Sequence, residues 1–163
     1  MQITLTKGTG TGNTLLSAYD KALDACGVSN YNIIPLSSII PPGANIVKEK
    51  FVTPDEDYGK RLYVVWARIE SDQIGKFIGG GLGWHQLSDG RGVFVEHHEF
   101  GSTKDEVEEK LKKDISTSVR DLCNIRSYTY TEEDIHMELE ISKVEKGPTG
   151  ILVMAIYQQD SWR

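Results

Sequence analysis

Residues 30–43 read NYNIIPLSSIIPPG, a stretch in which two adjacent serines separate two apolar runs. The β-like run that ends at Leu36 predicts a strand that stops at Ser37-Ser38. The second run is short, because Pro41-Pro42-Gly43 cannot continue a central strand. A simple linker would be polar on both sides of the serines. The stretch therefore predicts a strand end with a restricted backbone, and it divides the elements before it from those after it.

The part of the chain before the serine pair is predicted to fold as strand, helix and strand. Residues 2–6 alternate polar and apolar side chains like a short strand, and the Gly/Thr-rich residues 7–13 predict a turn. Apolar positions then follow helical spacing up to Cys26, with Thr14 as the expected N-cap and Gly27 as the expected end. The strand over residues 31–36 contains Pro35, which places it at a sheet edge or a bulge.

The part after the pair is rich in predicted strands. A polar loop over 48–60 leads to a strong strand at 61–70, and a Gly-rich apolar stretch at 74–87 indicates close backbone packing or bulges. The hairpin signal Asp89-Gly90 precedes a strand at 92–98.

A long helix follows these strands. Thr103 and Glu106 form the pattern of a capping box. The apolar stripe of this helix comprises Val107, Leu111, Ile115, Val119 and Leu122. Two final strands are expected at 135–143 and 151–157. Two helices and several alternating strands indicate an α+β fold in which helices cover sheets.

Composition narrows the class of protein. The 163 residues are most simply one domain, and a formal net charge of −6 disfavours nucleic-acid partners. No apolar run approaches the roughly 20 residues of a membrane span. The N-terminus lacks the apolar core of a signal peptide, so the cytoplasm is the expected location. Cys26 and Cys123 match no metal or disulfide spacing and are expected to be buried thiols.

The serine pair has a possible chemistry, since the Ser38 hydroxyl can attack the carbonyl of Ser37. A peptide carbonyl is a poor electrophile, but fixed geometry can supply roughly 7–11 kcal/mol of such a barrier. One oxyanion donor supplies about 3–4 kcal/mol more. Asn32, five residues before Ser37, carries an amide that could be this donor. Without further signals, however, two adjacent serines at a strand end most often form a plain turn.

Three segments together resemble the pyruvoyl-dependent arginine decarboxylases. The segment NIIPLSSIIPPG, preceded by LSAYDKAL at 16–23, is similar to the self-processing site of that family. Downstream, GVFVEHHEF at 92–100 and the capped helix beginning STKDEVEEKL at 102–111 match in order and spacing. The resemblance extends over most of the chain, and the segment around the serine pair is its specific part.

The resemblance implies a fold, a reaction and an assembly. The fold is the four-layer α/β/β/α sandwich of the pyruvoyl-dependent histidine and arginine decarboxylases. Self-cleavage by Ser38 Oγ would give a β chain, residues 1–37, and an α chain, residues 38–163, that begins with a covalent pyruvoyl group derived from Ser38. That group is an electron sink for a lyase that converts L-arginine to agmatine and CO2, in polyamine synthesis or in acid resistance. Family members assemble as trimers of αβ units or as pairs of trimers, with active sites between neighbouring subunits.

The resemblance also assigns site residues. Glu96 corresponds to the proton-donating glutamate, with Glu99 as the alternative, because the residues after Glu96 depart from the family pattern. Asp20 corresponds to the aspartate that binds the substrate, and a partly buried carboxylate there would favour a guanidinium group. Asn32 corresponds to an asparagine needed for processing. The substrate pocket would also be lined by Leu16, Ser29, Tyr31, Ser37 and Ile39, with Ser29 in place of the family's glycine.

Two other kinds of site are not predicted. His97 and His98 are adjacent on a strand and therefore point to opposite faces, so we predict no metal site. The segment KGTGTGNT lacks the Gly-Lys-Ser/Thr ending of a phosphate loop, so we predict no nucleotide site. Two alternatives to arginine decarboxylation remain open: the same chemistry on another amino acid, and an uncut, non-catalytic relative with the same fold.

Overall fold

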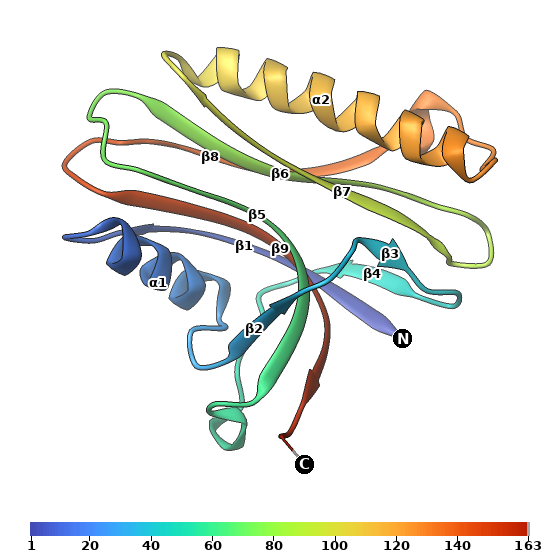
Figure 1. Ribbon diagram of the computed structural model, residues 1–163, viewed down its shortest axis with the longest axis horizontal. Helices are drawn as coiled ribbons and strands as arrows, with labels where there is room; N and C mark the ends of the chain where they lie inside the picture. The colour runs from blue at the N-terminus through green and yellow to red at the C-terminus, as the bar shows by residue number, and fades with distance from the viewer. Residues whose placement is uncertain (163) are drawn as a thin grey trace.

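Two β-sheets lie face to face in the computed structural model, which describes residues 1–162 (Figure 1). The strands are β1 (Gln2–Thr11), β2 (Asn32–Pro35), β3 (Ile39–Ile40), β4 (Asn45–Lys48), β5 (Arg61–Ser71), β6 (Phe77–Gln86), β7 (Gly92–Gly101), β8 (His136–Lys143) and β9 (Thr149–Asp160). The helices are α1 (Leu15–Cys26) and α2 (Lys104–Ile125), with short 3-10 turns at Asp55–Asp57 and Glu132–Asp134.

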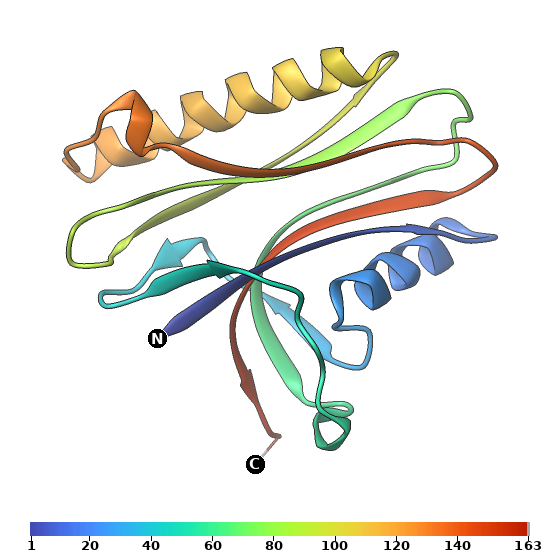
Figure 2. The same ribbon diagram turned by 180° about the vertical axis from the view of Figure 1, so that it is seen from behind.

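The five-stranded sheet has the order β2-β5-β9-β1-β4, and the four-stranded sheet has the order β3-β7-β6-β8. Helix α1 covers the outer face of the five-stranded sheet and α2 covers the outer face of the four-stranded sheet, as both views show (Figures 1 and 2). The predicted α/β/β/α sandwich is therefore confirmed. None of the helices in residues 1–162 is long and apolar enough to cross a bilayer.

Three apolar layers hold the sandwich together. The layer between the sheets includes Ile3, Leu82 and Phe94, all with no exposed surface. A second layer joins α1 to the five-stranded sheet, and a third joins α2 to the four-stranded sheet. The predicted stripe of α2 is buried, except that Cys123 takes the fully buried position and Leu122 is only partly buried. Both cysteines are buried free thiols, as expected.

The helix starts follow the predicted caps. Thr14 Oγ1 accepts the backbone N–H of Ser17, and Gly27 ends α1 in the left-handed region at φ 80°. Thr103 Oγ1 accepts the N–H of Glu106 at 3.1 Å. The Glu106 carboxylate reaches back one residue further than a standard capping box and accepts the N–H of Ser102.

The prediction of a turn at residues 7–13 is wrong, because β1 continues to Thr11. The glycines that suggested a turn bring α1 close to the sheet instead. A Cβ at Gly8 would lie 2.7 Å from Ala25 Cβ, and one at Gly10 would lie 2.3 Å from the Ala22 nitrogen. Strands β3 and β4 were also not predicted, because two and four residues give too little alternation to identify.

The Gly-rich strand β6 has the same role beneath α2, and this gives a test of stability. A Cβ at Gly83 would lie 2.1 Å from Ile115 Cγ2, whereas a Cβ at Gly80, on the other face, would meet Ala67 at an ordinary 3.5 Å. Gly83→Ala is therefore expected to lower the free energy of unfolding by about 1–3 kcal/mol or more through overpacking. Gly80→Ala, the matched control, should be neutral or stabilising by about 0.4–1 kcal/mol. Urea unfolding of both variants measures the difference, and equal stability would contradict this packing.

The serine pair lies where the chain changes sheets. Strand β2 ends at Pro35 on the edge of the five-stranded sheet, as predicted for a strand that contains proline. Strand β3 begins at Ile39 and pairs with β7 of the four-stranded sheet. Ser37 and Ser38 therefore connect the two layers of the sandwich at its open edge.

Candidate active site

Ser38 occupies a strained and nearly buried position. Its φ is +67°, in the left-handed region that non-glycine residues rarely adopt, and only 8% of its surface is exposed. Its carbonyl accepts the backbone N–H of Phe94 at 2.8 Å, which continues the β3–β7 ladder. Such a conformation costs about 1–3 kcal/mol and persists because the surrounding structure holds it.

The Ser38 hydroxyl faces a carboxylate on β7. Ser38 Oγ lies 2.8 Å from Glu96 Oε2 and 3.0 Å from Oε1, so the hydroxyl donates to the carboxylate. The register explains this contact. Because Ile39 pairs with Val93, the chain just before it runs along the β7 edge toward Glu96.

The surroundings of Glu96 change its acidity. Although the residue keeps exposed surface, its carboxylate lies against the Ser38 turn, and this burial raises the pKa of Glu96. The hydrogen bond from Ser38 and the nearby His97 act in the opposite direction and lower this pKa by less. Glu96 therefore stays protonated at a higher pH than a freely exposed glutamate would.

Strand alternation separates Glu96 from Glu99. Glu96 pairs with Leu82, whose side chain lies in the layer between the sheets, whereas Glu99 pairs with Gly79, whose missing side chain would face Val107 of α2. Directly opposed residues share a face, so Glu99 points to the α2 side, away from the Ser38 hydroxyl. The geometry favours Glu96 over Glu99 as the partner of residue 38.

Tyr157, near the end of β9, is a site residue that sequence reasoning missed. Its hydroxyl donates to the Ile39 carbonyl at 3.1 Å, and its ring packs edge-on against Phe94. Burial, together with the charge of Glu96, raises the pKa of Tyr157 far above its ordinary value. Tyr157 thus fixes the backbone one residue after Ser38 as a neutral donor. No local sequence signal marks it, because the contact joins distant segments.

Two cavities meet at Glu96. The first, of about 340 Å³, is lined by Ser37, Ser38, Phe94, Val95, Glu96, His97, Ser118 and Leu122. The second, of about 360 Å³, is lined by Pro35, Leu36, Trp66, Ala67, Arg68, Glu96 and His98. We call these the serine cavity and the tryptophan cavity. The Arg68 guanidinium lies 3.6 Å above the Tyr19 ring and pairs with Glu70 at 2.5 Å, so it joins α1 to the wall of the tryptophan cavity.

The residues expected to bind the substrate do not all gather around Ser38. Ser37 lines the serine cavity and Ile39 adjoins it, half-exposed on the next strand. Asp20 and Leu16 lie on the outer face of α1, where Leu16 is 72% exposed, and neither lines the serine or tryptophan cavity. The expectation that Asp20 is partly buried is wrong, because the inward face of α1 is taken by Ala18 and Ala22.

Three further predicted residues lie at the start of β2. Ser29 is half-buried, and the Tyr31 hydroxyl points inward and donates to Asp57 at 2.5 Å and Gln159 at 2.7 Å. Asn32 Nδ2 donates to the Gly59 carbonyl at 2.8 Å. Its expected contact with the Ser37 carbonyl is not made, because five residues of extended chain span about 16 Å.

The adjacent histidines point to opposite faces, as alternation predicts. His97 Nε2 lies 2.8 Å from Ser118 Oγ on α2, while His98 lines the tryptophan cavity. Within residues 1–162, no group of three or more potential metal ligands occurs.

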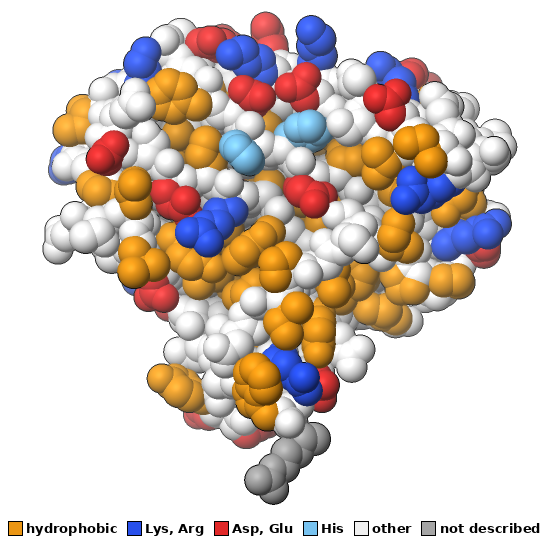
Figure 3. All heavy atoms as spheres, viewed as in Figure 1, with side chains coloured by type: hydrophobic (Ala, Val, Ile, Leu, Met, Phe, Trp, Pro, Cys, Tyr) orange, Lys and Arg blue, Asp and Glu red, His pale blue; other side chains and the backbone are white. Residues whose placement is uncertain are grey.

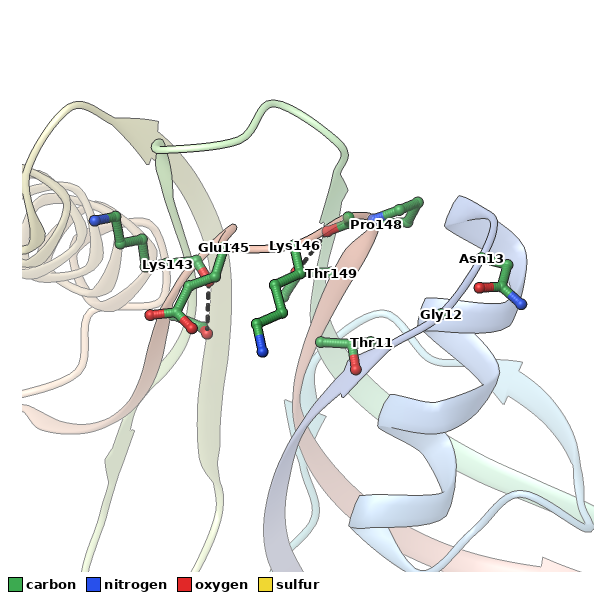
Figure 4. A pocket seen from close by; sticks show the side chains of 10 residues that line it. Thr11, Gly12, Asn13, Lys143, Glu145, Lys146, Pro148 and Thr149 are labelled. Carbon is green, nitrogen blue, oxygen red and sulfur yellow. Dashed lines mark hydrogen bonds between the residues drawn. The ribbon is translucent and has the colours of Figure 1, made fainter.

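A larger cavity, of about 640 Å³, lies away from this site, between the β1–α1 and β8–β9 connections (Figure 4). Its wall contains Ser142 and Glu145, but the Ser142 hydroxyl donates to the Lys143 carbonyl at 3.4 Å instead of to a carboxylate. On the face viewed in Figure 1, by contrast, histidine and acidic side chains adjoin a band of exposed hydrophobic groups (Figure 3). The combination of strained serine and carboxylate distinguishes the serine cavity as the candidate active site.

Comparison with known proteins identifies the family of the chain. The family described as pyruvoyl-dependent arginine decarboxylase (PvlArgDC) matches residues 2–161. Proteins of that name are 33% identical in Picrophilus torridus (64% of this chain and 59% of the relative), 33% in Thermococcus kodakarensis (69% of each chain) and 27% in Pyrococcus abyssi (90% and 88%). The match therefore spans less than two thirds of the Picrophilus protein but most of the Pyrococcus protein. The breadth of the family match establishes that this chain belongs to the pyruvoyl-dependent arginine decarboxylase family.

Proposed function

We propose that this chain, as a single domain, cleaves itself between Ser37 and Ser38, and that residue 38 becomes a pyruvoyl group used to decarboxylate L-arginine to agmatine. The observation that carries the proposal is the 2.8 Å hydrogen bond from the strained Ser38 hydroxyl to Glu96. Family membership supplies the reaction class, since the relatives are named pyruvoyl-dependent arginine decarboxylases.

The cleavage follows from the side chains around Ser38. Glu96 takes the hydroxyl proton while Ser38 Oγ bonds to the Ser37 carbonyl carbon, and the peptide bond to the Ser38 nitrogen breaks to leave an ester. Loss of the Ser38 Cα proton then breaks the bond between Cβ and the ester oxygen, and Ser37 leaves as a new C-terminal carboxylate. Water adds to the Cα of residue 38, and the nitrogen departs as ammonia to leave the ketone of the pyruvoyl group. The left-handed φ of Ser38 favours these steps, because strain in the intact chain is released when the peptide bond breaks.

Residues 37–39 and 96 also fit the product. A pyruvoyl group at position 38 supplies an electron sink for the electrons released when CO2 leaves. Glu96 then lies beside that position with a raised pKa, which suits a residue that delivers a proton to the substrate carbon. Tyr157 holds the Ile39 carbonyl and so fixes the direction of the group.

Substrate binding is proposed to need a neighbouring subunit. Leu16 is an exposed apolar side chain on the same face of α1 as the exposed Asp20, one turn before it, and Ile39 is exposed beside the serine cavity. Packing α1 of one subunit against residue 39 of the next would cover these side chains and bring Asp20 to the site. This supports the trimer, or pair of trimers, that the resemblance implies. A cytoplasmic location also stays a prediction.

The proposal is tested on the purified chain. Denaturing mass spectrometry should show fragments 1–37 and 38–163, and the larger fragment should react with a hydrazine through its terminal carbonyl. Agmatine should form from arginine much faster than the corresponding amines form from lysine, ornithine or histidine. One intact chain would indicate the uncut relative, and a preference for another amino acid would indicate the alternative substrate.

Asp20→Asn tests the guanidinium site. A hydrogen bond to a charged group contributes about 1.5–3 kcal/mol, so loss of the charge should raise the KM for arginine about tenfold to a hundredfold. Asp24→Asn is the matched control, because Asp24 lies on the exposed side of the same helix and pairs with Lys21 at 2.6 Å. Equal KM values for the two variants would remove Asp20 from the site.

A further inference from the structure

Cleavage at Ser37-Ser38 needs two proton transfers in its first step. The Ser38 hydroxyl must lose a proton as it attacks, and the Ser38 nitrogen must gain one as it leaves, because an amide nitrogen is a poor leaving group without it. Glu96 contacts the hydroxyl and accounts for the first transfer. The second transfer requires a separate donor near that nitrogen.

The serine cavity offers one candidate for this donor. Among the side chains that line it, only those of Glu96 and His97 are acids or bases, and the others are serines or apolar groups. Ser37 and Ser38 line the same cavity, which Glu96 borders from the face between the sheets and His97 from the face that contacts α2.

His97 is held in place by the helix on the outer face of the sheet. Its Nε2 lies 2.8 Å from the hydroxyl of Ser118, in the middle of α2. In the protonated ring both nitrogens carry hydrogens, so Nε2 donates to the Ser118 hydroxyl and Nδ1 holds the hydrogen that can be given up. The α2 helix packs on β7 through buried Val95 and Val119, which keeps the two partners in register.

We propose that His97, oriented by Ser118, supplies the proton taken up by the leaving Ser38 nitrogen. In the balanced step, the bond between Ser38 Oγ and the Ser37 carbon forms, and the bond between that carbon and the Ser38 nitrogen breaks. The hydroxyl proton moves to Glu96 while the nitrogen receives its proton from the protonated His97 ring, and a proton passed from Glu96 to His97 through water restores both groups. This assignment rests on the proposed function, and it gives His97 a part in processing without a part in arginine binding.

The adjacent histidine provides a matched control for the test. His97→Gln keeps an amide that can bond Ser118 but cannot relay a proton, while His98→Gln makes the same change on the opposite face. Mass spectrometry of newly synthesised chain follows the conversion of precursor to fragments 1–37 and 38–163. We expect cleavage of His97→Gln to slow by about 10²- to 10⁴-fold, the usual effect of losing a general acid, and that of His98→Gln to match wild type.

A second pair of variants separates proton transfer from positioning. Imidazole added to His97→Ala should restore cleavage in proportion to its concentration, and Ser118→Ala, which keeps the imidazole, should slow cleavage less than His97→Gln. A wild-type chain that stays uncut would overturn the proposed function as a whole. Two outcomes would overturn the role of His97 alone, provided that the wild-type chain cleaves. One is cleavage of His97→Gln as fast as wild type, and the other is a folded His97→Ala whose cleavage does not increase with added imidazole.

Discussion

Ser38→Ala is expected to remain one chain of 18.2 kDa and to form no agmatine. The substitution removes Oγ, the atom that attacks the Ser37 carbonyl. The same atom later departs from residue 38 as part of the new Ser37 carboxylate. The loss is therefore complete rather than graded, unlike the loss of a residue that only assists the reaction. Denaturing mass spectrometry and an arginine decarboxylation assay on the same sample measure both effects.

Ser37→Ala is the matched control for this prediction. Ser37 is exposed and contributes only its carbonyl to the cleavage, which alanine provides equally well. We expect this variant to cleave and to carry the pyruvoyl group. A Ser38→Ala chain that still yields fragment 38–163 would show that the break has another cause, such as a contaminating protease.

Local signals were sufficient to predict most of the secondary structure. Thr14 and Gly27 bound α1, and Asp89-Gly90 turns the chain between β6 and β7, as each residue type predicts. These features depend on neighbours within a few residues. The exchange of sheets at the serine pair also follows from the prolines around it, because they stop both strands before either can lengthen.

Long-range contacts limited the rest of the prediction. In the sequence alone the glycines of β1 predict a turn, because only the packed helix explains them: Gly10 leaves room for the backbone at Ala22. Tyr157 could not be predicted, since a tyrosine at a strand end has no distinguishing pattern. The partnership of Ser38 with Glu96 was available only through the family resemblance, because it depends on the register of β3 on β7.

The distance of two predicted site residues from Ser38 also has a physical explanation. Asp20 and Asn32 are exposed on the outer surface of the five-stranded sheet layer, on α1 and on an edge strand. Within one chain, β2 separates Asn32 from Ser38, and Asp20 lies on the exposed face of α1. A site completed by another subunit would explain why both types of residue accompany the serine pair in the sequence.

Glu96→Gln should impair two reactions at once. Glutamine cannot accept the Ser38 hydroxyl proton, and it cannot donate a proton to the substrate carbon after CO2 leaves. General acid or base catalysis contributes about 10²- to 10⁴-fold, so we expect a loss of that size in the cleavage rate and in kcat of the cleaved fraction. Time courses of cleavage and single-turnover assays on the purified cleaved protein measure the two losses separately.

The two reactions should also depend on pH in opposite directions. Burial raises the pKa of Glu96, and both reactions should respond at that raised value. Cleavage needs the carboxylate, so its rate should rise as the pH rises through this pKa. Turnover needs the acid, so kcat should fall over the same interval. Cleavage also removes the Ser38 hydroxyl, whose hydrogen bond lowers this pKa, which moves Glu96 further toward its acid form for turnover.

Glu99→Gln provides the control, because Glu99 lies three residues further along β7 and faces α2 instead of Ser38. Glu99→Gln should cleave and turn over like the unsubstituted chain. Both pH limbs, the rise of the cleavage rate and the fall of kcat with increasing pH, should remain. Glu96→Gln should flatten both limbs, because glutamine does not titrate. If the limbs survive in Glu96→Gln and disappear in Glu99→Gln, the proton donor is Glu99, and the 2.8 Å contact of Ser38 with Glu96 serves only to hold the turn.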